Sequence, residues 1–371
     1  MSRARRIARG LAVALGRSLL ALLVVWTVTA IALGRIEPPG LRLGLAAMFA
    51  TGVAWALAHV KPFAHALLRV AAASLLVVVA FILAPASNEG RWPPDVARIT
   101  RADIDGDRVR LHDVRDFRWR SDQNYTPRWE DREYRISDLH DVDLVMSYWG
   151  PREFCHTFVS FGFADGRRLA ISVETRKQMG EEYSAVAGFF RRYTLAYIFA
   201  DERDLLALRT DVRGEEVFVY RVPLPPDTLR AFFLAYLDET NQLAARPRWY
   251  HALADSCGIN ILERLRDATG HMRWDRHTFL NGRWDELLWA QGRIGPGLSF
   301  EELRRRSQVG PRRPASDHLD DYSEQIRAGL PVALPRPTPH FRKNAGGRPG
   351  RRDRRSRPHC GPRGARHIRR G

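Results

Sequence analysis

The sequence predicts an α+β domain held to a membrane by helices near its N-terminus. Three observations support this fold class. Long uncharged apolar runs fill the first part of the chain, alternating β-rich segments follow, and segments with apolar residues at helical spacing come later. The order of these patterns predicts an N-terminal anchor, a sheet and then helices that pack on it.

Three apolar runs are long enough to predict transmembrane helices. They are residues 18–34, 43–60 and 67–85, and they define a predicted anchor within residues 1–90. A helix needs about 20 apolar residues to cross the hydrocarbon of a bilayer, with about 17 as the lower limit. The first run could instead be a cleaved signal peptide, because a basic flank precedes it. However, another apolar run follows it, without the polar sequence that a cleavage site would precede.

The net charge of +17 is carried by the two ends of the chain. Residues 1–17 hold five arginines and no acid, and residues 336–371 hold thirteen Arg and Lys against one acid, which leaves residues 18–335 neutral. The folded part therefore lacks the basic face of a nucleic-acid-binding protein. Because arginine-rich flanks stay in the cytoplasm, three spans place the following domain outside it. We expect a protein of the bacterial inner membrane with its domain in the periplasm.

Residues 91–335 are predicted to form that globular domain, and residues 336–371 to form a disordered basic tail. The tail is rich in Pro, Gly and Arg and has little apolar area to bury. Within the domain, alternating or β-rich runs predict strands at Val109–Trp119, His156–Phe163, Arg168–Glu174 and Glu216–Val222. Apolar residues at helical spacing predict helices at Asp227–Asn241, with Asp227 as its cap, and at Cys257–Thr269. Asp201–Asp211 is dense in charge and could form a salt-bridged, solvated face.

The clearest hairpin joins the strands at His156–Phe163 and Arg168–Glu174. Its turn is Ala164–Gly166, where Gly166 is free to adopt a positive φ. With a three-residue loop the register places His156 opposite Glu174, with both side chains on one face. A two-residue loop would place Thr175 there instead.

Cys257 lies at the predicted start of a helix that ends before Gly270. Asp255 and Ser256 precede it as candidate caps. The positive end of a helix dipole favours a thiolate, and the free N–H groups of the first turn can stabilise an oxyanion. Cys257 is therefore a candidate nucleophile. It could equally be a small buried apolar residue, or half of a disulfide with Cys155.

His156 is the candidate base, and Glu174 is the candidate carboxylate that fixes its tautomer. The pair could also be a structural contact on a wet sheet face. Cys155 neighbours His156 on the strand and points to the opposite face, so we expect it to be buried. No metal-ligand spacing or phosphate-binding loop is visible, and we expect no cofactor and no metal.

Six segments in order resemble the Lnb N-terminal periplasmic domain family, over about residues 115–270. The segments are RWEDREY, DLHDVDLVMSYWG, FCHTFVSFGFADGRRLAISVETR, GFFRRY, ADERDLLALRTD and PRWYHALADSC. The resemblance implies a circularly permuted papain-like fold of the NlpC type with a small antiparallel sheet. It also places His156 and Cys257 at the family's catalytic histidine and cysteine. The family usually has Asn-Cys-Thr at the nucleophile, whereas this chain has Ser256-Cys257-Gly258.

Lnb proteins resemble lipoprotein N-acyltransferases, so the resemblance implies a cysteine-dependent acyltransferase. The expected acyl donor is a phospholipid, the expected acceptor is the N-terminus of a lipoprotein, and Cys257 would carry the chain as a thioester. Two other functions remain open: a papain-like peptidase or cell-wall amidase that uses the same residues, and a non-catalytic periplasmic binding module. In the last case Cys257 would lie away from His156 or be bridged to Cys155.

Overall fold

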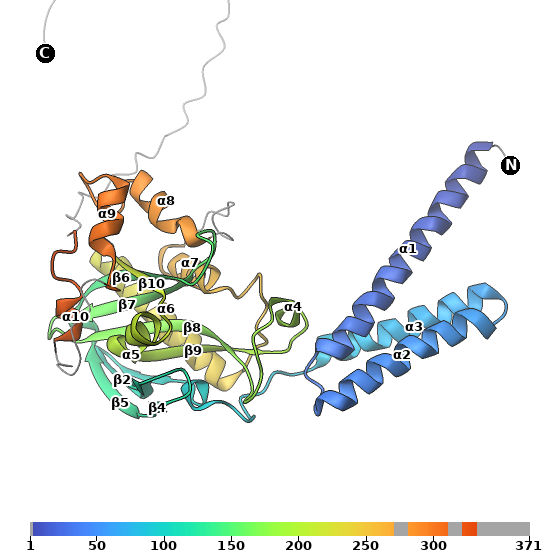
Figure 1. The fold of residues 1–371 in the computed structure, drawn as a ribbon, viewed down its shortest axis with the longest axis horizontal. Helices are drawn as coiled ribbons and strands as arrows, with labels where there is room; N and C mark the ends of the chain where they lie inside the picture. The colour runs from blue at the N-terminus through green and yellow to red at the C-terminus, as the bar shows by residue number, and fades with distance from the viewer. Residues whose placement is uncertain (1–2, 271–280, 311–320, 332–371) are drawn as a thin grey trace, which may run out of the picture. The chain divides into compact units, whose positions relative to one another are not determined.

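An eight-stranded sheet organises the domain, with helices packed on both faces (Figure 1). The computed structural model describes residues 3–270, 281–310 and 321–331, so the predicted disordered tail at 336–371 lies outside the described residues. The strands of the sheet are β1 (Arg101–Asp105), β2 (Arg108–Arg115), β5 (Trp129–Arg135), β6 (Leu139–Tyr148), β7 (His156–Phe163), β8 (Arg168–Arg176), β9 (Thr194–Asp201) and β10 (Glu216–Val222). Their order is β1-β2-β9-β8-β7-β6-β10, and β5 pairs with β2.

The helices cover the two faces of this sheet unequally. Side chains of α6, α7, α8 and α9 share the larger apolar core with one face, and those of α5 and α10 share the smaller core with the other. The helices of the domain are α4 (Ala185–Gly188), α5 (Glu202–Ala207), α6 (Pro226–Ala245), α7 (Cys257–Thr269), α8 (Trp284–Ala290), α9 (Phe300–Ser307) and α10 (Tyr322–Gln325). A π-helical turn at Leu208–Val212 follows α5, and the short strands β3 (Arg118–Trp119) and β4 (Tyr125–Thr126) pair with each other.

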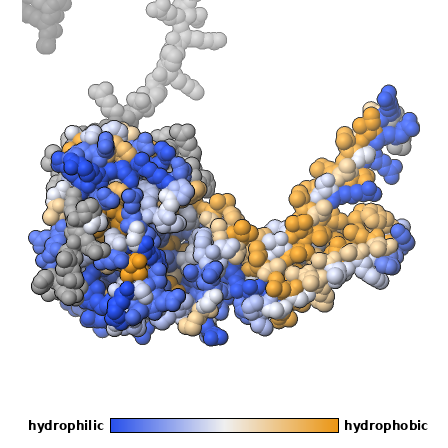
Figure 2. Space-filling model, in the orientation of Figure 1, coloured by the Kyte–Doolittle hydropathy of each residue, from blue (hydrophilic) through white to orange (hydrophobic). Residues whose placement is uncertain are grey.

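Three helices before the domain are long and apolar enough to cross a membrane. They are α1 (Arg3–Leu33), α2 (Pro39–His59) and α3 (Phe63–Leu83). Each contains most of one predicted span, and Figure 2 shows apolar side chains along their lengths. The predicted fold class, a mixed helix and sheet domain after three such helices, is therefore confirmed at this level.

The sheet is larger than the small antiparallel sheet that we expected, and one of its strand pairs, β2 with β9, is parallel. The sequence did not reveal β9, because nearly all of its residues are buried. A strand covered on both faces has a continuous apolar run without alternation, and periodicity alone does not distinguish it from a buried helix.

Two other predicted elements differ in detail. The strand expected at Val109–Trp119 breaks into β2 and β3, with a register shift between Leu111 and Val114 where Asp113 has a φ of 62°. Helix α6 begins with Pro226 at its first position, so Asp227 lies in the first turn and is not the cap. Proline is well suited to that first position because its missing N–H would have no helical partner there.

The Asp201–Asp211 segment is a buried element and not a solvated face. Glu202, Arg203, Asp204 and Arg209 are all buried. Asp204 accepts hydrogen bonds from the guanidinium of Arg115 at 2.9 and 3.0 Å. Charges that leave water need such partners, and the sequence pattern alone did not show where the partners lie.

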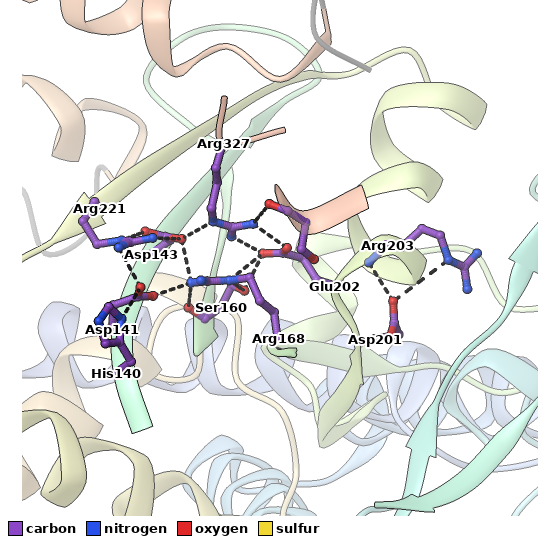
Figure 3. A network of polar contacts seen from close by, with 11 residues as sticks. His140, Asp141, Asp143, Ser160, Arg168, Asp201, Glu202, Arg203, Arg221 and Arg327 are labelled. Atoms are coloured by element: carbon purple, nitrogen blue, oxygen red, sulfur yellow. Dashed lines mark hydrogen bonds and ion pairs between the residues drawn. The ribbon is translucent and has the colours of Figure 1, made fainter. Parts of the chain in front are cut away.

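A network of buried charges holds the last described segment against the sheet (Figure 3). Arg327, just after α10, lies 2.8 Å from a carboxylate oxygen of Asp143 on β6 and 2.7 Å from one of Glu202 on α5. Arg168 on β8 also contacts Asp143, at 2.7 Å. Gly162 leaves room for this arrangement, because a Cβ there would clash with Arg168 and with Asp141.

Replacing Arg327 with leucine should destabilise the fold at neutral pH, because it leaves Asp143 and Glu202 buried with one cation fewer. We expect the free energy of unfolding to fall by about 3 kcal/mol, measured by urea titration of the full-length protein in micelles. Burial alone would raise the pKa of Asp143, but Arg168, Arg327 and Arg221 hold it well below its ordinary value. The stabilisation should therefore be present above the ordinary carboxyl pKa of 3.8 and be lost as the pH falls below it.

The matched control is Arg305→Leu, since Arg305 forms its ion pair with Glu302 on an exposed surface of α9. This control should change the free energy of unfolding far less than Arg327→Leu does, because solvent screens an exposed ion pair. Equal effects of the two substitutions would contradict a stabilising role for the buried network.

Candidate active site

A cleft of about 870 Å³ opens where β7 begins and β8 ends. These ends meet because the two strands are antiparallel. Cys257, His156 and Glu174, the three residues singled out in the sequence, all line this cleft. Arg209 and Asn281, which the sequence did not single out, line it as well. Among the described residues, no group of His, Cys, Asp or Glu is arranged to hold a metal ion.

Cys257 is the first residue of α7, as predicted. Ser256 is the cap, and its hydroxyl accepts a hydrogen bond from the backbone N–H of Ile259 at 3.3 Å. Asn260 is fully buried and fixes this turn, because its amide donates to the carbonyl of Ser256 at 3.1 Å and accepts from the hydroxyl of Tyr197 at 2.7 Å. Gly270 ends the helix with a φ of 73°.

The sulfur of Cys257 lies against the backbone of β7 on both sides of His156. Its Sγ is 3.4 Å from the backbone nitrogen of Thr157 and 3.8 Å from the carbonyl oxygen of Cys155. The ladder between β7 and β8 begins only at Val159 with Ile171, so this part of β7 has no paired strand on that side. The side-chain amide of Asn281 also donates to Sγ, at 3.4 Å. Within the described residues, no hydrogen bond joins Sγ to the imidazole of His156.

Gly258 explains how the departure from Asn-Cys-Thr fits this fold. A Cβ at Gly258 would lie 3.1 Å from Cβ of Asn281 and 3.1 Å from a ring carbon of Trp284. The missing side chain lets Asn281 and Trp284 pack tightly against the first turn of α7. Asn281 is held in that position because it also donates to the carbonyl of Cys155 at 2.9 Å.

His156 contacts Glu174 as the three-residue hairpin loop predicted. The backbone N–H of Phe163 donates to the carbonyl of Arg167 at 3.0 Å, and Gly166 has a φ of 85°. Nε2 of His156 is 3.5 Å from Oε1 of Glu174. A shorter connection runs through Ser172, whose hydroxyl is 2.7 Å from Nε2 and donates to Glu174 at 2.7 Å.

This relay sets the tautomer of His156. The hydroxyl of Ser172 donates its only proton to Glu174, so its oxygen must accept the hydrogen bond from Nε2–H of His156. The lone pair of the neutral ring is then on Nδ1, which has no hydrogen-bond partner in the described ranges. Nδ1 is therefore the nitrogen that can accept a proton.

Arg209 places a positive charge beside Glu174. It is buried in the π-helical turn, lies 3.2 Å from Oε1 of Glu174 and stacks over the ring of Phe158 at 4.9 Å. Burial and the charge of Arg209 lower the pKa of His156 to about 4. Burial would raise the pKa of Glu174, but His156, Arg209 and the Ser172 hydroxyl lower it to about 2. At pH 7 the imidazole is therefore neutral, beside a compensated carboxylate.

Cys155 is a buried free thiol and forms no disulfide with Cys257. Burial raises the pKa of the Cys155 thiol. Cys155 packs in the larger core, whereas Phe158, on the same face of β7 as His156, packs in the smaller one. The bridged arrangement that would favour a non-catalytic module is thus absent, since both cysteines are reduced.

Three polar residues of the site were not found from the sequence. Ser172 could have been, because it lies two residues before Glu174 on the same face of a predicted strand. Arg209 is within the charge-dense segment, but only the fold shows which charge it accompanies. Asn281 lies 24 residues after Cys257, and no local pattern predicts that their side chains meet.

The comparison with known families agrees with the resemblance seen in the sequence. Residues 125–286 match the family model of the Lnb N-terminal periplasmic domain, so the predicted family is confirmed for this region. The match contains His156, Glu174, Cys257 and Asn281. No curated protein and no solved structure matches the chain. The match to a periplasmic domain, together with the three apolar helices, indicates a membrane-anchored protein with a periplasmic domain.

Substitutions on either side of the relay should shift the pKa of His156 in opposite directions. Arg209→Met removes a nearby positive charge and should raise it from about 4, whereas Glu174→Gln removes the nearby negative charge and should lower it. The measurement is the pH dependence of carbethoxylation of His156 in the full-length protein, read by mass spectrometry of the peptide.

His112 provides an internal control in the same samples. Hydrogen bonds from His112 to Asp103 and Asp131 raise its pKa, and neither substituted residue contacts it. Its profile should stay unchanged in both variants. A shift of His156 in the same direction in both variants would disprove the assigned charge arrangement.

Proposed function

We propose that this protein is a membrane-anchored periplasmic thiol acyltransferase, with Cys257 as nucleophile, His156 as base and Glu174 as the residue that orients His156. The acyl donor is a phospholipid, and the acceptor is the N-terminus of a lipoprotein. One observation supports this proposal most: a cysteine at a helix N-terminus shares a cleft with a histidine whose Nε2 is hydrogen-bonded and whose Nδ1 has no partner among the described residues.

The proposed reaction proceeds through a thioester. Nδ1 of His156 accepts the thiol proton as Sγ of Cys257 attacks the ester carbonyl of the phospholipid. The carbon–oxygen bond then breaks, and the lysophospholipid oxygen takes that proton from His156. In the second half, the free α-amine of the acceptor attacks the thioester, the amide forms, and the sulfur leaves and recovers a proton.

Donors around the sulfur support the anionic stages of this reaction. The backbone N–H of Thr157 and the amide of Asn281 both point at Sγ, at 3.4 Å each. The N-terminal end of α7 adds the positive end of its dipole. Such pre-positioned donors stabilise charge as it develops on sulfur or on the carbonyl oxygen.

The side chains that line the cleft indicate which kind of substrate it can bind. Apolar and aromatic side chains, among them Tyr183, Tyr250 and Leu253, favour an acyl chain. Lys177, Arg213 and Glu215 line the same cleft and favour a polar substrate. For this reason a papain-like hydrolase of peptides or cell-wall amides is the second candidate function, with the same nucleophile and base.

Cys257 should acquire an acyl chain when the full-length protein is placed in vesicles of phospholipid with isotope-labelled acyl groups. Mass spectrometry should find the label on the Cys257 peptide, and neutral hydroxylamine should release it, as expected of a thioester. Adding a diacylated lipopeptide with a free α-amine should move the label to that amine. Cys257→Ser should abolish both steps, and Cys155→Ser should leave them unchanged.

Variants of the other two residues test their roles. His156→Ala should abolish acylation, whereas Glu174→Gln should reduce it less, because the base remains in place. Cleavage of a peptide or cell-wall amide without acylation would favour the hydrolase. Absence of both reactions with a labelled lipid still bound would favour a binding module.

The domain should lie outside the cytoplasm, in the periplasm above the bacterial inner membrane, because three spans follow an arginine-rich N-terminus. A reporter that fluoresces only in the cytoplasm should be dark when fused after Gly371. Alkaline phosphatase, which is active only outside the cytoplasm, should be active at the same point. The reverse pair of results would overturn this orientation.

A further inference from the structure

Exposed apolar side chains of the domain gather beside the cleft. Within the described residues after α3, eight large apolar side chains are exposed. One of them, Ile104, lies on β1. The other seven lie in the connections next to β7, β8 and α7, which form the site. Five of them form what we call the apolar rim: Met179, Tyr183, Val186, Phe189 and Leu253. Isolated exposed apolar residues are ordinary, but a group at one place marks an interaction surface.

The apolar rim is continuous with the cleft. Tyr183 and Leu253 belong to both, since they line the cleft that contains Cys257. The ring of Phe189 meets the ring of His251 edge-on at 5.3 Å, which joins the α4 segment to the loop that leads to Cys257. A ligand that touched the rim would therefore meet the entrance of the cleft.

The residues that follow α4 contact the ends of the apolar helices. The domain and these helices belong to one compact unit, Met1–Leu334. Arg191 donates to the carbonyls of Phe81 and Ile82 in the last turn of α3. Arg192 donates to the carbonyl of Gly34, just after α1, at 2.8 Å. Both arginines use carbonyl groups that a helix end leaves without helical partners.

Phe190 reaches further along α1 than these arginines do. Its ring lies 6.0 Å from that of Trp26, seven residues before the end of α1 at Leu33. With a rise of 1.5 Å per residue, Trp26 is roughly 10 Å along the axis from that end. Phe190 thus lies beside the apolar part of α1, and Val186 and Phe189 are its exposed neighbours in the chain.

The sequence of the segment suits a lipid environment. Tyr183–Phe190 reads YSAVAGFF, without a charge, between Glu182 and Arg191. One position further out on each side, Glu181 pairs with Arg192. A short uncharged apolar stretch with charges at its two ends is the pattern expected of a loop that enters the interface of a bilayer.

We propose that the apolar rim enters the outer leaflet of the bilayer that holds the anchor, so that the cleft opens directly onto lipid. The occupant of this surface is the acyl region of phospholipid, and not a second protein. The contact with the anchor favours this occupant, because Phe190 lies beside Trp26 of α1, a helix long and apolar enough to cross the bilayer. Val186 is four residues before Phe190 in the same uncharged stretch. The inference concerns where the cleft opens and holds whichever reaction Cys257 performs.

The test places an environment-sensitive fluorophore on the rim. Val186→Cys is made in the full-length chain with Cys257→Ser and Cys360→Ser, which leaves only the buried Cys155, and is labelled with a nitrobenzoxadiazole. The protein is reconstituted into vesicles of phosphatidylethanolamine and phosphatidylglycerol, with or without lipid that bears a nitroxide at carbon 5 of the acyl chain. We expect blue-shifted emission and at least twofold quenching by the nitroxide.

Ile104→Cys in the same background is the matched control, because Ile104 is also an exposed apolar residue but lies on β1. It should emit as in water and resist quenching. Water-like emission at position 186 would overturn the proposal, and so would equal quenching at both positions. Because these variants lack Cys257, the result is independent of the acyl-transfer experiment.

Discussion

The site depends on the position of one sulfur atom against the unpaired edge of β7. Cys257 occupies the place where a neighbouring strand would continue the ladder, and it interacts with the backbone on both sides of His156. Three constraints keep it there: the Ser256 cap, the buried Asn260 that is bonded to Tyr197, and the amide of Asn281. Cys257 and His156, which are 101 positions apart in the sequence, thereby line one cleft.

The second constraint is that buried charges need partners of opposite charge, and one short segment supplies several of these partners. From Asp201 to Asp211 the chain supplies Glu202 to the network around Arg327, Asp204 to Arg115, and Arg209 to Glu174. The first two contacts fix the sheet to its neighbours, and the third adjusts the charge beside His156. The same run of residues therefore connects the stability of the fold to the electrostatics of the site.

The sequence was informative where local rules decide the structure. Helix α7 has a cap, an apolar face and a terminal glycine, and the β7–β8 hairpin has alternation and a turn glycine, so both were predicted with their ends nearly correct. Local patterns did not reveal β9, which is buried on both faces, or the partners of Arg209 and Asn281. Those features depend on which segments the fold brings together, and a charged or amide side chain does not encode its partner.

Arg191 and Arg192 have a consequence for the modularity of the protein. They donate to the carbonyls of Phe81, Ile82 and Gly34, so the ends of two helices complete the surface of the domain. A fragment cut free at residue 91 would keep both guanidinium groups and lose all three acceptors. Domain and anchor are thus matched parts, and a chimera with a foreign anchor would have to retain these helix ends to preserve the junction.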